Sequence, residues 1–301
     1  MKNVKVGHTS PIVCLDAGHY GKYNRSPAGP VYYESEMTWK LQQLLKEELI
    51  SYGIIVATTR KNQDVDMGLK ARGMASKDCD LFVSIHSNAV PGGQVNDAVD
   101  YVVVYHQYED DGTDVDDKSK EFANLIAPVI ASVMETKQDH MVSTRKGSGD
   151  WNSDGVMNDN YYSVLNGSRL VETPGVILEH SFHTNTRIVE WLLVEDNLKK
   201  LAKAEAEAIA VYFDIAQQNT VTPPSKFLDM KIPVLKKGMT SDSVMALRAL
   251  LEGYGYDCSG TGTDGLYTAA LETVVIAYQL DHELDGDGSV GRATWTSLLR
   301  L

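Results

Sequence analysis

Short apolar runs alternate with stretches of helical periodicity through the first two-thirds of the chain. The apolar runs, rich in Val and Ile, lie at residues 11–15, 54–58, 81–85, 101–105 and 175–178. Apolar residues recur at helical spacing over residues 37–50, 119–133 and 189–213. Strands that alternate with helices favour a largely parallel sheet whose two faces are both covered. The pattern therefore predicts an α/β fold with a mostly parallel, twisted sheet between layers of helices.

The pattern changes after residue 215. Residues 216–233 are polar, contain a Pro-Pro pair and show no sustained period, which indicates a linker. Beyond them, helical patterns predict a small three-helix domain, with helices at residues 242–251, 269–280 and 293–299. We therefore expect a first domain at residues 1–215, a linker at 216–233 and a second domain at 234–301.

Length, hydropathy and charge narrow the class of protein. The 301 residues exceed the ~250 at which a single core usually stops growing, which agrees with two domains. No apolar run approaches the ~20 residues that a membrane span needs, so we expect no membrane insertion. The formal net charge of -13 argues against a nucleic-acid partner, because phosphate binding needs clustered Lys and Arg.

The first 20 residues do not have the pattern of a secretory signal. Their apolar stretch is short and is interrupted by Pro11. We therefore expect synthesis in the cytoplasm without a signal peptide, so that any target outside the membrane is reached by other means.

The three cysteines argue against one class of metal site. Cys14, Cys79 and Cys258 are far apart in the sequence and form no CxxC pair. The chain therefore suggests neither a disulfide framework nor a cysteine-ligated zinc site.

Three polar residues directly follow strand-like runs: His19 in LDAGH, His86 in LFVSIH and Glu179 in GVILE. Side chains beyond the carboxyl ends of strands in an open α/β sheet converge on one crevice, so these residues can meet. Glu34 stands at the start of the first helix and can approach the same rim. Two imidazoles and a carboxylate, with a fourth position left open, form a catalytic zinc set.

Each of these residues also has a purely structural explanation. A histidine after a strand is more often a hydrogen-bonded structural residue, and a glutamate at a helix start usually favours the helix dipole. Two His and two Glu at equivalent strand ends or an adjacent helix start are hard to assemble by chance. The combination therefore favours a metal site.

Several motifs occur in a specific order over residues 11–213. They are LDAGH at 15–19, Glu34 opening a helix, Gly53, Thr59 with Arg60, Leu69 with Arg72, DLFVSIHSNA at 80–89 and PGVILEHSFHTN at 174–185. This ordered set resembles the zinc-dependent N-acetylmuramoyl-L-alanine amidases of the type-3 family, found in bacterial autolysins and phage endolysins. DAGH or SIHSN alone is a weak signal, whereas the ordered set is a strong one.

The resemblance implies roles for four residues. His19, Glu34 and His86 match the family's zinc ligands, and Glu179 matches its catalytic glutamate. The family's spacing favours Glu34 over Glu36 as the ligand. The implied activity is hydrolysis of the amide between N-acetylmuramic acid and L-alanine in bacterial peptidoglycan, with Zn2+ as the cofactor.

Departures from the family pattern lie close to these motifs. Tyr20 follows DAGH where the family often has glycine, and EHSF replaces an ELGF-like stretch at Glu179. His180 and His183 therefore lie beside the expected site, where each can pack, cap, polarise the substrate carbonyl or bond a neighbouring carboxylate. Residues 140–170 depart most, and we expect them to build the substrate groove.

The second domain resembles the three-helix peptidoglycan-binding domain that often accompanies such enzymes. The resemblance rests on residues 264–279, DGLYTAALETVVIAYQ, and 285–299, DGDGSVGRATWTSLL. Arg248, Thr268 and Leu271 replace the Gln, Gly and Thr of the family pattern. The resemblance implies the fold and a peptidoglycan partner.

Two other functions compete with the amidase hypothesis. A zinc peptidase would cut within the stem peptide, whereas only the amidase frees an L-alanine amino terminus. A catalytically inactive wall-binding protein is the second alternative, and a zinc assay would separate it from the enzyme. The architecture favours a phage or prophage endolysin acting at the bacterial cell wall.

Overall fold

The computed structural model describes residues 2–108, 114–150, 155, 159–215, 234–262, 264–282 and 284–299. The chain forms two compact units, Met1–Asn219 and Thr220–Leu301. The linker predicted at residues 216–233 lies outside the described residues.

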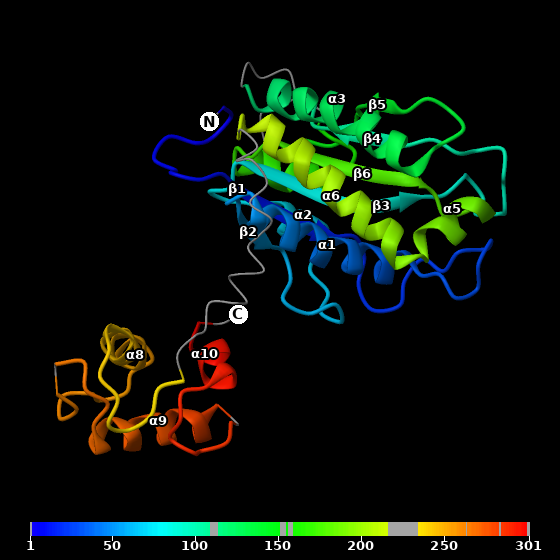
Figure 1. Ribbon diagram of the computed structural model, residues 1–301. Coiled ribbons are helices and arrows are strands. Elements are labelled where there is room, and N and C mark those ends of the chain that lie inside the picture. Colours follow the sequence, from blue (N-terminus) through cyan, green and yellow to red (C-terminus); the bar gives the residue numbers. More distant parts are fainter. Residues whose placement is uncertain are drawn as a thin grey trace. The chain divides into compact units, whose positions relative to one another are not determined.

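The first unit is built on a six-stranded sheet with the order β2-β1-β3-β6-β4-β5 (Figure 1). The strands are β1 (Ile12–Ala17), β2 (Ile55–Thr58), β3 (Leu81–Asn88), β4 (Val103–His106), β5 (Met141–Ser143) and β6 (Gly175–Phe182). β1 pairs in parallel with β2 and β3, and β3 pairs in parallel with β6. β4 is antiparallel to β6 and parallel to β5. The predicted mostly parallel sheet is therefore confirmed, with one antiparallel pairing between β6 and β4.

Helices cover both faces of this sheet, as predicted. They are α1 (Glu34–Ser51), α2 (Leu69–Met74), α3 (Val115–Met134), α4 (Ser163–Leu170), α5 (Thr186–Leu192) and α6 (Glu195–Tyr212). Figure 1 shows α1 and α6 in front of the sheet and α2 behind it. β5, α2 and α4 were not predicted, because each is short and mixes apolar with polar residues.

The prediction of one long helix over residues 189–213 was wrong. The segment forms α5 and α6, separated by Leu193 and Val194. Asn185 caps the first turn of α5 by accepting a hydrogen bond from the backbone N–H of Ile188. Val194 has an extended backbone, with φ -86 and ψ 116, which interrupts the helix before α6 begins.

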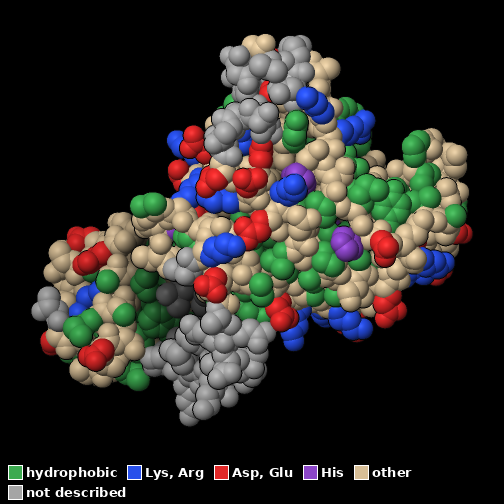
Figure 2. Space-filling view, turned by 90° about the horizontal axis from the view of Figure 1, so that it is seen from above, with side chains coloured by type: hydrophobic (Ala, Val, Ile, Leu, Met, Phe, Trp, Pro, Cys, Tyr) green, Lys and Arg blue, Asp and Glu red, His purple; other side chains and the backbone are tan. Residues whose placement is uncertain are grey.

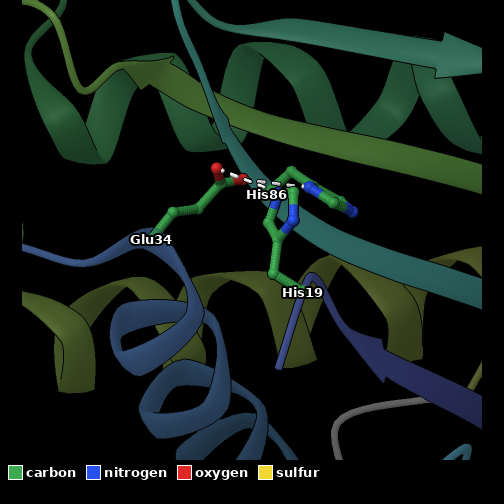
Figure 3. A group of neighbouring side chains, drawn as sticks. All are labelled: His19, Glu34 and His86. Carbon is green, nitrogen blue, oxygen red and sulfur yellow. Dashed lines mark hydrogen bonds and ion pairs between the residues drawn. The ribbon is translucent and has the colours of Figure 1, made fainter. Parts of the chain in front are cut away.

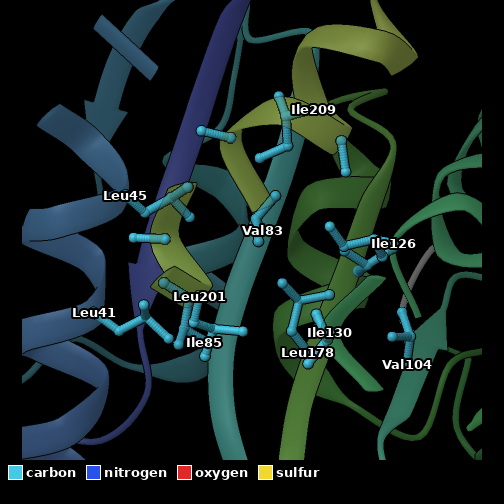
Figure 4. Close-up of a cluster of buried hydrophobic side chains, with 14 of the residues drawn as sticks. Leu41, Leu45, Val83, Ile85, Val104, Ile126, Ile130, Leu178, Leu201 and Ile209 are labelled. Atoms are coloured by element: carbon cyan, nitrogen blue, oxygen red, sulfur yellow. The ribbon is translucent and has the colours of Figure 1, made fainter. Parts of the chain in front are cut away.

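The main core lies between the sheet and the layer of α1, α3 and α6. Leu41 and Leu45 from α1 meet Val83 and Ile85 from β3 there, together with Leu201 from α6 (Figure 4). All five side chains are fully buried. Burying an aliphatic side chain of this size contributes ~1.5–3 kcal/mol to folding, so this layer holds the strand ends rigidly.

The opposite face of the sheet carries a smaller core under α4. Cys14, Cys79, Phe82 and Val164 form it, and both cysteines are free thiols. α2 and α4 approach closely at two glycines. A Cβ at Gly73 would lie 2.0 Å from a backbone carbonyl of α4, so only glycine permits this contact. The contact fixes α2, which carries a buried arginine toward the site.

The second unit contains the three predicted helices, α8 (Asp242–Gly253), α9 (Ala269–Asp281) and α10 (Arg292–Leu299). Its core includes Leu247, Leu271, Tyr278 and Trp295. The prediction of a small three-helix domain is therefore confirmed.

The three departures from the family pattern have structural roles in this unit. Arg248 is buried and donates hydrogen bonds to the carbonyls of Thr261 and Leu266, both at 2.9 Å. Thr268 caps α9 by accepting a hydrogen bond from the backbone N–H of Leu271. Leu271 is a fully buried core residue. The three substituted residues therefore stabilise the three-helix fold that the resemblance implied.

The helices in the described part of the chain are too short or too polar to cross a membrane. Lys and Arg side chains lie interspersed with Asp and Glu on the face seen in Figure 2.

Candidate active site

The carboxyl ends of β1, β3 and β6 bring the predicted site residues together. His19 lies just after β1, His86 lies near the end of β3, and Glu179 lies in β6. His86 and Glu179 are directly paired in the register of the two strands. Glu34 is the first residue of α1, whose start lies at the same edge of the sheet.

The side chains of His19, Glu34 and His86 converge on one another (Figure 3). Each offers one donor atom, and these three atoms lie within 4.8 Å of one another. The Nε2 atom of His19 is 3.1 Å from Oε2 of Glu34, and Nδ1 of His86 is 2.9 Å from Oε1. Two donors bound at ~2.0–2.1 Å to one tetrahedral zinc ion lie roughly 3.3 Å apart. Both observed separations are close to that value, so the three residues fit such an ion.

A hydrogen-bonded loop fixes the backbone of His19. His19 has φ +61, in the left-handed region, and the preceding Gly18 packs against the imidazole of His86. A Cβ at Gly18 would lie 2.4 Å from that ring, so glycine is required there. Arg72 donates hydrogen bonds to the carbonyls of Ala17 and His19, at 3.1 and 3.2 Å. Arg72 is therefore a support for the loop that presents His19.

Hydrogen-bond donors surround the Glu34 carboxylate, which is 1% exposed. Its Oε1 accepts from the backbone N–H of Ser87 at 3.0 Å, and its Oε2 accepts from Nδ2 of Asn24 at 2.8 Å. Burial alone would raise the pKa of Glu34, but its bonds with His19 and His86 outweigh burial and hold the pKa well below its usual value. Glu34 is therefore maintained as a carboxylate in a buried setting.

Glu179 is a second buried carboxyl group with different surroundings. Its Oε2 has no hydrogen-bond partner among the described residues. Burial raises the pKa of Glu179 to about 8, and the negative charge of Glu34 contributes to the rise. Glu179 is therefore a carboxyl group that can gain and lose a proton near neutral pH.

His180 in β6 and Glu205 in α6 form a fully buried pair. Nε2 of His180 is 2.6 Å from Oε1 of Glu205 in α6, and both side chains have no exposed surface. Nδ1 of His180 is 2.8 Å from the backbone carbonyl of His86 and therefore donates to it. Burial lowers the pKa of His180, but Glu205 outweighs burial and raises it. The pair thus ties the end of β3 to α6.

His183 lies behind Glu34 as a buried, neutral imidazole. Its Nδ1 donates to the backbone carbonyl of Ser87 at 2.9 Å and lies 3.9 Å from Oε2 of Glu34. Tyr32 stacks on the ring at 6.0 Å between centroids, and its hydroxyl bonds the Ser87 hydroxyl. Burial lowers the pKa of His183. Of the roles weighed for the two extra histidines, the structure shows a bond to a neighbouring carboxylate for His180, which pairs with Glu205, and packing with a backbone hydrogen bond for His183.

Ser181 explains how the chain departs from an ELGF-like stretch. Its backbone has φ +54, a conformation that favours glycine. The Ser181 hydroxyl donates a 3.1 Å hydrogen bond to the buried carboxylate of Asp100. Asp100 also pairs with Arg187 at 2.6 Å. These contacts hold a non-glycine residue in this backbone conformation inside β6, two residues after Glu179.

Asn24 is the site residue that sequence reasoning missed. Its Nδ2 atom is 2.8 Å from Glu34 and 3.1 Å from Nε2 of His19. Asn24 lies in a polar loop without periodicity, so no pattern distinguished it. Only the folded loop shows that it joins two of the predicted residues.

The fold is an α/β sheet with two imidazoles and a carboxylate gathered at one edge, beside a titratable glutamate. These features define the class of protein as one with a candidate metal site. Residues 13–211 match the N-acetylmuramoyl-L-alanine amidase family, and the chain belongs to this family. Residues 240–298 match a peptidoglycan binding domain. These two matches agree with the two resemblances read from the sequence.

One curated relative is an endolysin of Bacillus phage SPP1. It is 38% identical over 96 residues, which cover 31% of this chain. The match spans 35% of the endolysin's own length.

Solved structures share the fold of the first unit. The catalytic domain of CwlV, an N-acetylmuramoyl-L-alanine amidase from Bacillus (Paenibacillus) polymyxa var. colistinus, matches with a TM-score of 0.53 and 20% identity, covering 68% of this chain and 99% of that one. The N-acetylmuramoyl-L-alanine amidase from Clostridium difficile 630 matches with a TM-score of 0.54 and 23% identity, covering 69% and 98%. At this identity the likeness shows the fold.

Proposed function

We propose that this protein is a zinc-dependent N-acetylmuramoyl-L-alanine amidase that cleaves the bond between N-acetylmuramic acid and L-alanine in peptidoglycan. The observation that carries the proposal is the position of Glu179. Glu179 is the register partner of His86 in the sheet, and His86 belongs to the donor set of His19, Glu34 and His86. Family membership supplies the substrate class.

His19, Glu34 and His86 would hold the zinc ion through Nε2, a carboxylate oxygen and a ring nitrogen. Zinc in such a three-ligand site supplies a Lewis acid that activates water and polarises a carbonyl near neutral pH. The hydrogen bonds to Glu34 from Asn24 and Ser87 keep that carboxylate oriented toward the two imidazoles. The protein thus contributes a rigid arrangement of ligands rather than flexible ones.

Glu179 would act as the general base and then as the general acid. It takes a proton from the attacking water and returns it to the departing amine of L-alanine. An efficient catalyst of this type has a pKa near the working pH. Burial raises the pKa of Glu179, whereas a neighbouring cation would lower it. These opposing influences suit a group that must first accept a proton and then donate it.

The second unit would bind the wall and keep the catalytic unit near its substrate. Its match to a peptidoglycan binding domain supports this role. The endolysin relative supports a phage or prophage endolysin as the biological context.

Mass spectrometry of peptidoglycan digested by the zinc-loaded protein tests the proposal, with an EDTA-treated sample as control. We expect free stem peptides that begin with L-alanine, absent from the control. New amino termini inside the stem peptide would indicate a peptidase instead. Intact wall in both samples, with zinc bound, would indicate a wall-binding protein.

A further inference from the structure

A cluster of tyrosines and cations lies on the β4–β5 side of the sheet. We call it the Arg145 cluster, and it consists of Tyr105, Tyr108, Arg145, Lys146, Tyr161 and Tyr162. The guanidinium of Arg145 stacks 3.6 Å from the ring centroid of Tyr161 and 5.9 Å from that of Tyr162. Nζ of Lys146 lies 5.5 Å from the ring centroid of Tyr108. Arg145 and Lys146 are both exposed, so the cluster presents two cations to solvent.

The sheet register places Tyr105 of this cluster opposite Ile177, two residues before Glu179 in β6. β6, which carries Glu179, is followed across the sheet by β4 with Tyr105 and then by β5, after which Arg145 lies. Val103 is paired with Glu179, and Tyr105 is two residues further along, so Tyr105 and Glu179 face the same side of the sheet. The metal-type donors lie on the other side of Glu179, on the β1 and β3 side.

Tyr162 joins Arg145 to Tyr105 within the cluster. Its ring lies 4.9 Å from that of Tyr105, between centroids, and it immediately precedes α4. The pKa of Tyr162 is raised mainly by burial and by Tyr105, and the charge of Glu179 adds to the rise. Tyr162 thus lies against both Arg145 and Tyr105, and Tyr105 faces the same side of the sheet as Glu179.

The chemistry of the cluster suits a carboxylate. A guanidinium stacked face-on against a tyrosine still presents N–H donors along its edge, in the geometry that binds a carboxylate with two hydrogen bonds. The stack also restricts the side chain before a ligand arrives, which reduces the entropy lost on binding. Arg145 and Lys146 place two cations side by side in a chain whose net charge is -13.

We propose that the Arg145 cluster binds a carboxylate of the stem peptide during catalysis. This inference rests on the proposed function, in which Glu179 returns a proton to the amine of the departing peptide. The peptide then lies on the Glu179 side of the scissile bond, and its next residues extend over β4 and β5. The stem peptide carries carboxylates within a few bonds of its L-alanine end, and the glycan strand would remain on the β1 and β3 side.

Kinetics of the zinc-loaded full chain on two synthetic substrates test this inference. One is a muramoyl tripeptide with free carboxylates on its second and third residues, and the other is the same compound with those carboxylates amidated. We expect Arg145→Gln to raise KM for the free acid about fivefold, an effect the size of one exposed charge-assisted contact, while kcat changes less than twofold. KM for the amidated compound should not change.

Two further variants complete the design. Arg145→Lys keeps the charge and should recover part of the lost affinity. Lys203→Gln, which removes an exposed cation from α6 on the opposite face of the sheet, should leave both KM values unchanged. The effect of Arg145→Gln should also shrink at high salt, because the contact is exposed.

The outcomes separate this inference from the proposed function. An equal rise in KM for both substrates, or a loss confined to kcat, would overturn the carboxylate contact while leaving the amidase proposal intact. If the folded, zinc-loaded wild type cleaves neither compound at the L-alanine amide, both proposals fall. Calorimetry of the free tripeptide with metal-free protein provides a readout without turnover, and equal affinities of wild type and Arg145→Gln would also contradict the inference.

Discussion

The two buried carboxyl groups of the site, Glu34 and Glu179, differ in what surrounds them. Glu34 accepts hydrogen bonds from Asn24 and the backbone of Ser87 and lies against two imidazoles, and its pKa is held low. Glu179 is also buried, but its Oε2 lacks a partner among the described residues and its pKa is raised to about 8.

This difference assigns different chemistry to the two groups. A carboxylate kept ionised by donors and imidazoles is suited to bind a cation, and a carboxyl group with a raised pKa is suited to transfer protons. Each group also affects the other, since the charge of Glu34 helps to raise the pKa of Glu179. Variants that change one residue at a time therefore test whether Glu34 and Glu179 have these different roles.

The largest effect is expected from His86→Ala, which removes a donor on the Glu34 side. Metal binding at a structural zinc site contributes roughly 10–16 kcal/mol, and losing one of three protein ligands removes a large share. We expect zinc affinity to fall by roughly 10³ or more, with activity lost in parallel. Competition with a fluorescent chelator measures the affinity.

His140→Ala is the matched control for the loss of a histidine. His140 is exposed and lies in the loop before β5, away from the donor set. Its removal should leave zinc affinity unchanged. Normal zinc binding by His86→Ala would show that the assigned donor set is wrong.

Glu179→Gln should separate proton transfer from metal binding. General acid–base catalysis contributes about 10²–10⁴ in rate, so we expect kcat to fall by that factor. Zinc affinity should stay within a few-fold of wild type, because Glu179 is not among the three donors. A near-normal rate for this variant would remove Glu179 from the mechanism.

The fold could be predicted from the sequence wherever the pattern is long or strongly apolar. The buried strands β1, β3 and β6 read as continuous apolar runs, because both of their faces are covered. β5 has only three residues, two of them partly buried, and carries no comparable pattern. The break between α5 and α6 was missed because apolar spacing continues through Leu193 and Val194 while the backbone does not.

The site was predictable to the extent that its residues end strands or open a helix. His19 follows β1, and although β3 and β6 continue beyond His86 and Glu179 to Asn88 and Phe182, the three residues lie toward the same edge of the sheet. Asn24 depends on the shape of an irregular loop, which periodicity does not encode. The pairing of His180 with Glu205 joins residues 25 positions apart in different elements, and no local signal specifies it.

The buried pair of His180 and Glu205 offers a test of how rigidly the end of β3 is held. His180→Leu leaves the Glu205 carboxylate buried without its partner, which typically costs about 3–5 kcal/mol. The double variant His180→Leu/Glu205→Leu replaces the pair with apolar side chains and should recover most of that loss. Guanidinium unfolding of the metal-free protein measures both.

Zinc affinity of the double variant then distinguishes stability from positioning. His180 donates to the backbone carbonyl of His86, so its loss should weaken zinc binding about tenfold even when folding is restored. Wild-type zinc affinity in a well-folded double variant would mean that the pair supports the fold alone. Single variants that are as stable as wild type would contradict the buried ion pair itself.

The smallest effect is expected in the pH dependence of stability, and it arises from the raised pKa of Glu179. The pKa of this carboxyl group is raised from 4.5 to about 8 in the folded protein. The protonated form is thus favoured by folding, and its stabilisation is fully present below pH 4.5 and is lost as pH rises toward 8. At ~1.4 kcal/mol per pKa unit the upper limit is roughly 5 kcal/mol, and we expect about 2 because Glu34 and Glu179 titrate together.

Urea unfolding of metal-free wild type and Glu179→Gln at pH 5.5 and 8 measures this term. Glutamine resembles the protonated carboxyl group at both pH values, so the stability advantage of the variant over wild type should be larger at pH 8 than at pH 5.5. Glu190→Gln, an exposed change on α5, should show no such difference. If Glu179→Gln has the same stability advantage at both pH values, the raised pKa of Glu179 is wrong, and the contrast with Glu34 must come from hydrogen bonding rather than from proton affinity.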